Sequence, residues 1–181
     1  MPLTPSKESR TRLHVRQITY AGWQRDDGLF DIEARLVDTK DRDFPLASGM
    51  RVAGDPVHDM SARVTIDRDC TVHAIETSSD RTPYPGGCDA PLPEYGRLVG
   101  VNLLNGFRKN LYDAVGDVSG CTHMTELIAF LPTAALQTFA GLQRNVELNE
   151  EKPFQLDRCH ALQTSTETVR RYYPKWFRGT A

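Results

Sequence analysis

A tight turn followed by strict alternation is the feature that most limits how this chain can fold. The turn Arg25-Asp26-Asp27-Gly28 contains an Asp-Gly pair, and the apolar residues after it, Phe30, Ile32, Ala34 and Leu36, alternate with charged ones. Asp-Gly is typical of hairpin turns, and a period of two is typical of a strand with one buried face. The pattern predicts an antiparallel hairpin whose apolar face must be covered by other elements.

Three more segments extend this hairpin into a sheet. Leu13–Gln24 is rich in β-branched and aromatic residues and predicts the first strand, while 56–67 and 70–76 predict the third and fourth. In the third strand His58 shares a face with Met60, Ala62, Val64 and Ile66. Because these apolar residues face the core, the imidazole of His58 is expected to point towards the interior as well. The stretch 38–55 between the second and third strands is predicted to be a polar loop.

The second half of the chain has helical spacing. The pattern predicts one helix from Leu98 to Val115 and another from Met124 onward, with a kink or break at Pro132 and a further helix over 133–142. The predicted fold class is α+β: an antiparallel sheet of three or four strands with helices packed on one face.

Length and composition favour one domain and exclude several classes of protein. With 181 residues, we expect a loose leader over 1–12 and a single domain over 13–181, whose C-terminal aromatic tail folds back. The net charge of -2 argues against a nucleic-acid partner. No apolar run is long enough for a membrane span and no signal peptide is recognisable, so a cytoplasmic protein is expected. Four cysteines without a CxxC pair are expected to be reduced.

Three short polar clusters carry side chains suited to catalysis: His58-Asp59, Cys121-x-His123-x-x-Glu126 and Cys159-His160. Brought together, His58, Cys121 and His123 would supply a metal site with an open position, for which zinc or iron is the candidate. Cys121 could instead be a nucleophile at a helix start, with His123 or His58 as its base.

A third interpretation needs neither metal nor thiolate. His123 with Asp59 or Glu126 would form an acid–base pair that moves protons on a bound small molecule. The plain alternative is that Cys121 is a small buried hydrophobe and Glu126 a carboxylate in the first helical turn. Tyr84, in a rigid proline-rich loop, Arg63 and Trp176 are the candidate substrate-binding residues.

Several separated motifs resemble one bacterial family, the domain of unknown function 2889. The motifs occur in order over nearly the whole chain, at 25–33, 56–60, 83–85, 120–127, 157–162 and 173–176. The resemblance implies membership of a family whose name assigns no activity.

The expected architecture is also similar, more distantly, to iron–sulfur scaffold proteins of the NifU and SufE type. That likeness implies ligands at His58-Asp59, Cys88, Cys121 and His123. Those scaffolds have a thiol where this chain has His58. The departure argues against cluster assembly and leaves a mononuclear metal or acid–base site at the same place.

The expected function is that of a small-molecule enzyme with lyase-like or hydrolytic chemistry. Aromatic side chains and the absence of a phosphate-binding glycine loop favour a small aromatic or organic acid as substrate, as in aromatic compound catabolism. The alternatives are a metal or sulfur carrier or scaffold without catalysis, and a binding module. A homodimer is left open.

Overall fold

The computed structural model describes residues 2–140, 142, 152–153 and 155–179. They belong to two compact units, Met1–Ala140 and Gly141–Ala181, and each unit is described by itself.

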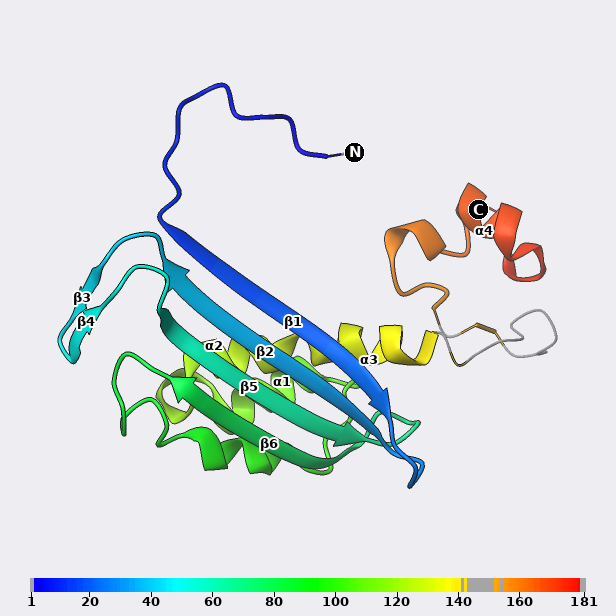
Figure 1. The fold of residues 1–181 in the computed structure, drawn as a ribbon. Coiled ribbons are helices and arrows are strands. Elements are labelled where there is room, and N and C mark those ends of the chain that lie inside the picture. Colours follow the sequence, from blue (N-terminus) through cyan, green and yellow to red (C-terminus); the bar gives the residue numbers. More distant parts are fainter. Residues whose placement is uncertain (1, 141, 143–151, 154, 180–181) are drawn as a thin grey trace. The chain divides into compact units, whose positions relative to one another are not determined.

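A four-stranded antiparallel sheet forms the frame of the first unit. The strands β1 (His14–Gln24), β2 (Phe30–Lys40), β5 (Pro56–Ile66) and β6 (Val72–Arg81) lie in the order β1-β2-β5-β6. Each strand therefore pairs with its neighbour in the chain, apart from the inserted β3 and β4 (Figure 1). The predicted antiparallel sheet is confirmed.

Helical segments cover one face of this sheet (Figure 1). They are α1 (Phe107–Val115), α2 (Thr122–Ala129) and α3 (Leu131–Ala140), with the short 3₁₀ turns η1 (Leu92–Leu98) and η2 (Asp117–Ser119). The α+β class with helices on one face is also confirmed. None of the described helices combines the length and apolarity needed to cross a membrane.

The core lies between the sheet and the helices. The alternating residues that predicted the hairpin, Phe30, Ile32, Ala34 and Leu36, are buried there. Side chains from β5 and from all three helices complete the core, among them Met60, Val64, Leu111, Leu127 and Leu131. Gly22 lets α3 approach β1 closely, because an added Cβ would lie 1.9 Å from Thr138 Oγ1.

The helix predicted from Leu98 begins later, at Phe107. The backbone before it pairs with the start of β6: Gly100 N–H donates to Val72 O at 2.8 Å, and Leu103 N–H donates to Cys70 O at 2.8 Å. Those groups are not free for helical bonds. The apolar spacing that predicted a helix reflects burial of Leu103 in the core.

The predicted polar loop over 38–55 contains strand structure. Strand β2 continues to Lys40, and a two-stranded hairpin of β3 (Phe44–Leu46) and β4 (Gly49–Arg51) follows.

The helix break predicted at Pro132 is present. Helix α2 ends at Ala129, and α3 starts at Leu131 with the proline in its first turn.

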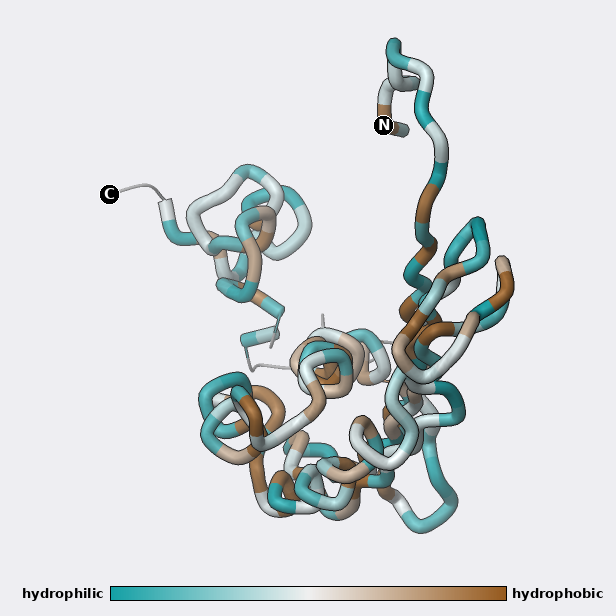
Figure 2. Tube along the Cα trace, turned by 90° about the vertical axis from the view of Figure 1, so that its left-hand side faces the viewer, coloured by the Kyte–Doolittle hydropathy of each residue, from teal (hydrophilic) through white to brown (hydrophobic). Residues whose placement is uncertain are grey.

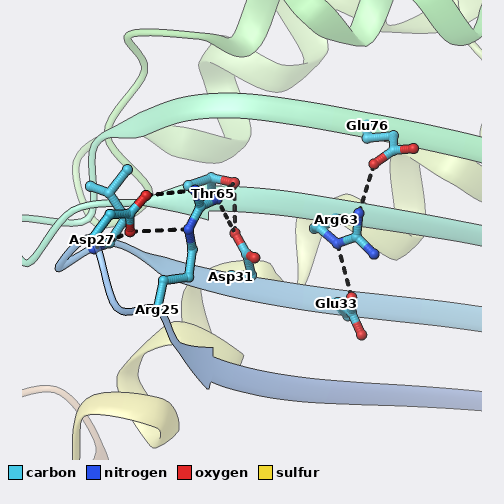
Figure 3. A network of polar contacts seen from close by, with 8 residues as sticks. Arg25, Asp27, Asp31, Glu33, Arg63, Thr65 and Glu76 are labelled. Atoms are coloured by element: carbon cyan, nitrogen blue, oxygen red, sulfur yellow. Dashed lines mark hydrogen bonds and ion pairs between the residues drawn. The ribbon is translucent and has the colours of Figure 1, made fainter.

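The other face of the sheet is polar. Arg63 donates to Glu33 at 2.9 Å and to Glu76 at 2.8 Å, so that one guanidinium joins three strands (Figure 3). Nearer the β1–β2 turn, Thr65 Oγ1 donates to Asp31 at 2.7 Å. Such exposed cross-strand pairs contribute little stability each, but they keep this face solvated.

The second unit and the leader complete the described chain. The second unit contains η3 (His160–Leu162), α4 (Glu167–Tyr172) and η4 (Pro174–Trp176), with Leu156 and Val169 buried. Residues 2–12 have no helix or strand and are exposed. They run as a mostly hydrophilic stretch that bends near its N-terminal end (Figure 2). The proposed return of the aromatic tail stays a prediction, and most of the polar stretch 145–152 lies outside the described residues.

Candidate functional site

A buried carboxylate, Asp38, stands at the centre of a polar cluster where the apolar face of the sheet ends. Asp38 continues the alternation of the buried residues Phe30 to Leu36 and therefore points to the same face of the sheet. Although its side chain is charged, only 3% of its surface is exposed. Its register partners are Arg16 on β1 and His58 on β5, so all three side chains lie on the helix-covered face. The pairing of β2 with β5 shifts just after Asp38, and such irregularities often occur beside active sites.

Both carboxylate oxygens of Asp38 are fully engaged. Arg16 donates from Nε and from its terminal nitrogen at 2.8 Å each, His14 Nε2 lies 2.9 Å from Oδ1, and His58 Nδ1 lies 3.0 Å from Oδ2. Burial would raise the pKa of Asp38, but the hydrogen bonds from Arg16 and His14 outweigh it and hold that pKa well below its usual range. Asp38 is therefore an anion at neutral pH.

An ionised carboxylate accepts hydrogen bonds and cannot donate them, which fixes the tautomer of His58. Nδ1 of His58 must carry the proton that it shares with Asp38, and Nε2 is left as the basic nitrogen. Burial and the neighbouring His123 lower the pKa of His58 from its ordinary value. The result is a neutral, oriented imidazole, which is the form that a general base requires.

The start of α2 brings a second imidazole onto the first. The ring centroids of His58 and His123 lie 4.0 Å apart, with 34° between the ring planes. A hydrogen bond with Cys121 raises the pKa of His123. Burial acts to raise the pKa of Cys121, but its hydrogen bond with His123 lowers that pKa overall. Two adjacent imidazoles are thus biased towards opposite protonation states.

Tyr95 holds the beginning of α2 in place. This residue is fully buried, and its hydroxyl accepts from Cys121 N–H at 3.1 Å and lies 2.9 Å from Cys121 O and 2.7 Å from Thr125 Oγ1. Cys121 is the N-cap residue of α2 but makes no side-chain cap. The phenol therefore satisfies the N–H of Cys121, while Cys121 O also accepts the first hydrogen bond of the helix from Thr125 N–H at 2.8 Å.

The cluster is closed on the β1 side by an ion pair. One terminal nitrogen of Arg16 lies 3.5 Å from Glu126 Oε2, and the side chain of Glu126 is 52% exposed. The structure therefore brings together four of the predicted site residues: His58, Cys121, His123 and Glu126.

Two other predicted residues lie on the opposite face of the sheet. Asp59 adjoins His58 in sequence and so points the other way, where Arg35 binds it through two hydrogen bonds of 2.8 and 2.7 Å. Arg63 faces the same side, between Glu33 and Glu76 (Figure 3). The carboxylate beside His58 is Asp38, and Asp59 does not join it.

Of the remaining candidates, Tyr84 is half exposed in the loop that follows β6. This loop contacts the β3–β4 hairpin, since Arg51 donates to Thr82 O at 3.0 Å. Trp176, Cys159 and His160 belong to the second unit, which is described separately. Cys88 is a free cysteine in the same loop as Tyr84.

Asp38, His58 and His123 could together hold a metal ion. Each offers one ligand atom, and these atoms lie within 4.8 Å of one another. Two imidazoles and one carboxylate are a donor set used for zinc and for iron(II). The sequence predicted Cys121 as the third ligand, whereas the structure groups Asp38 with the two histidines.

Sequence reasoning missed Asp38, His14, Arg16 and Tyr95. A signal for Asp38 was present: the even-numbered apolar series of 30–36 reaches position 38 if the strand is allowed to continue. Because position 38 was assigned to a polar loop, its place in this alternating series was not recognised. Arg16 and His14 become partners only through the strand register, which sequence periodicity does not give.

Comparison with known proteins identifies the family. No curated protein and no solved structure matches the chain. The likeness to NifU and SufE proteins therefore stays a prediction. Residues 14–137 match the family described as "Protein of unknown function (DUF2889)". This range includes the whole cluster: Arg16, Asp38, His58, Cys121, His123 and Glu126. The chain belongs to the DUF2889 family.

Proposed function

We propose that this protein is a small-molecule enzyme that uses His58 as a general base and His123 as the neighbouring acid. The reaction would be lyase-like or hydrolytic, and the substrate a small aromatic or organic acid. The observation that carries the proposal is the pair of adjacent, tilted imidazoles in which one ring is oriented by the buried Asp38 and the other is partnered by Cys121.

The surroundings of the two rings support catalysis by proton transfer. His58 is held on a strand, and its side chain is 14% exposed, so that a small substrate could reach it while bulk water is largely kept away. Arg16, about one-third exposed, places a cationic group beside it, to which the carboxylate of an acid could bind, and the raised pKa of His123 favours its protonated form. Environments that separate the pKa values of two neighbouring groups are typical of acid–base sites.

Metal-assisted chemistry is the second candidate, because the ligand atoms of Asp38, His58 and His123 cluster within 4.8 Å. The engagement of Asp38 argues against it. A metal would have to compete for this carboxylate with the guanidinium of Arg16, which holds both oxygens at 2.8 Å. We therefore rank metal-free proton transfer first.

A metal or sulfur carrier is less well supported. Carriers need exposed, mobile ligand residues that can reach a partner protein. Here the residues come from β2, β5 and α2: Asp38 and His58 are hydrogen-bonded to each other, and the backbone of Cys121 is held by Tyr95. A binding module would need neither the oriented tautomer of His58 nor the thiol beside His123.

The proposal is tested by elemental analysis together with a substrate screen. The purified full chain and its His58→Gln variant are incubated with a panel of small aromatic and aliphatic carboxylic acids and esters, and products are followed by NMR. We expect turnover without bound metal, and a loss of about 10²- to 10⁴-fold in His58→Gln, as is typical when a general base is removed.

His73→Gln is the matched control. His73 is also paired with a carboxylate, with Nε2 2.8 Å from Asp67, but it is half exposed and lies outside the cluster. It should leave turnover unchanged. Equal losses in the two variants would refute the role of His58. Stoichiometric zinc or iron that is lost in His58→Ala and His123→Ala would replace the metal-free route with the metal-assisted one.

A further inference from the structure

Strand β1 is an open edge of the sheet. It is eleven residues long and pairs on one side with β2 over its whole length, without a register shift. Within the described residues, the backbone of β1 makes no hydrogen bond beyond that ladder. Alternate N–H and C=O groups of an edge strand point outward and can accept another strand.

The edge lacks the usual protection against pairing. β1 contains no proline and no lysine, and its unbroken register shows no bulge. It also exposes large apolar side chains: Ile18 is 42% and Trp23 is 56% exposed. Unprotected edges of this length are generally paired or covered in stable proteins.

The opposite edge differs. β6 carries a pairing irregularity near each end, and η1 follows it closely, with Thr77 Oγ1 donating to Leu92 O at 3.2 Å. The β1 edge, by contrast, borders a groove of about 510 Å³ that is lined by Tyr20, Ala21 and Gly22 of the strand and by Thr133, Ala134, Gln137 and Thr138 of α3. A strand added to β1 could place side chains in this groove, as in other cases of strand addition.

The sequence of β1 suits pairing with itself. A two-fold axis generates an antiparallel ladder from two copies of one strand. Centring the axis on Thr19 pairs all eleven residues, from His14 opposite Gln24 to Gln24 opposite His14. Val15 then faces Trp23, which is a favourable combination of β-branched and aromatic side chains. Arg16, the strand's one Arg or Lys, faces Gly22, so the two arginines do not meet.

We propose that β1 pairs antiparallel with β1 of a second copy of this chain, about a two-fold axis at Thr19, to give a continuous eight-stranded sheet in a homodimer. The proposal is independent of the proposed catalytic function, because it rests on the strand edge alone.

Disulfide trapping tests the pairing and its register. Thr19→Cys should form an intermolecular disulfide under mild oxidation, since the two residues face each other across the axis at a Cα distance that a disulfide can span. Gln17→Cys is the matched control on the same face of the same strand. Its two copies would be offset by four residues, about 13 Å along the strands, and should not cross-link. Both variants are made in a Cys159→Ser background, because Cys159 is exposed.

Sedimentation velocity on the full chain gives the second readout. We expect a species of twice the chain mass, and at least tenfold weaker association for Thr19→Glu, which places two carboxylates face to face, than for Gln17→Glu, which faces Ala21. A monomer at all concentrations would overturn the proposal and leave the edge to a different partner protein. A dimer in which Thr19→Cys cross-links no better than Gln17→Cys would overturn it as well.

Discussion

At the scale of single residues, Asp38 determines the chemistry of the cluster. It fixes the tautomer of His58, holds Arg16 and His14, and remains ionised although it is buried. A buried anion with this many partners is costly to disturb, because its removal leaves partly buried cations without compensation.

Replacement of Asp38 should therefore be more destabilising than replacement of a similar carboxylate elsewhere. We expect Asp38→Asn to lower the free energy of unfolding by about 2–4 kcal/mol, less than for a fully buried pair because Arg16 is partly exposed. Urea denaturation measures this loss. Asp59→Asn is the control: Asp59 also binds an arginine through two hydrogen bonds, but Arg35 is 56% exposed, and about 1 kcal/mol or less should be lost. Equal losses would contradict the special role of Asp38.

At the scale of elements, the site depends on the docking of α2 against the sheet. The N-terminus of α2 carries Cys121, His123 and Glu126, while its other side buries Met124, Leu127 and Ile128 in the core. Tyr95, from η1, anchors this end through the backbone of Cys121.

Tyr95→Phe should loosen this anchor without leaving a large cavity. The change removes the only acceptor recorded for Cys121 N–H among the described residues, and we expect a loss of about 1–3 kcal/mol. Thermal and urea unfolding would show it. Tyr20→Phe is the control. It removes one hydrogen bond, from a half-buried hydroxyl to Leu127 O at 2.9 Å, and should lower the free energy of unfolding by about 1 kcal/mol or less. The prediction fails if Tyr20→Phe is the more destabilised variant.

The elements also show what sequence could and could not predict. Alternation at 30–36 and 58–66 gave the strands correctly, because burial of one sheet face imposes a period of two. Helical spacing at 98–106 was misleading. Asn102 forms a β-bridge with Thr71, just before β6, and Leu103 is buried in the core without being helical. His58, Cys121, His123 and Glu126 were found from their chemical types, whereas Asp38 and Arg16 required strand register, which depends on long-range pairing.

At the scale of the whole molecule, the charge arrangement predicts sensitivity to acid. Hydrogen bonds from arginine, histidine or backbone groups hold the pKa values of Asp38, Asp59 and Asp67 below normal, and in the second unit the pKa of Asp157 falls to about 2, chiefly through Lys152. A carboxyl group with a lowered folded-state pKa stabilises the fold above its unfolded pKa of about 4, and this contribution disappears as the pH falls towards the folded value.

We therefore expect the free energy of unfolding to fall steadily below about pH 4. The lowered pKa of His58 acts in the same direction below about pH 6.5, whereas the raised pKa of His123 gives a contribution that is complete below about pH 6.5 and is lost only as the pH rises above it. Urea unfolding between pH 7 and pH 3 measures the profile. It should be shallower below pH 4 for Asp38→Asn, and a wild-type profile that is flat from pH 5 to pH 3 would contradict the expectation.

The contributions to the cluster come from chain segments that are far apart: residues 14–16, 38, 58 and 121–126. Contacts of such large sequence separation form late, because closing each long loop costs entropy before the contact stabilises it. The protonation state of the histidines should therefore become native only when β1, β2, β5 and α2 have all assembled. In refolding experiments, the time at which the NMR signals of His58 and His123 reach their native positions would therefore report when the folding of this unit is complete.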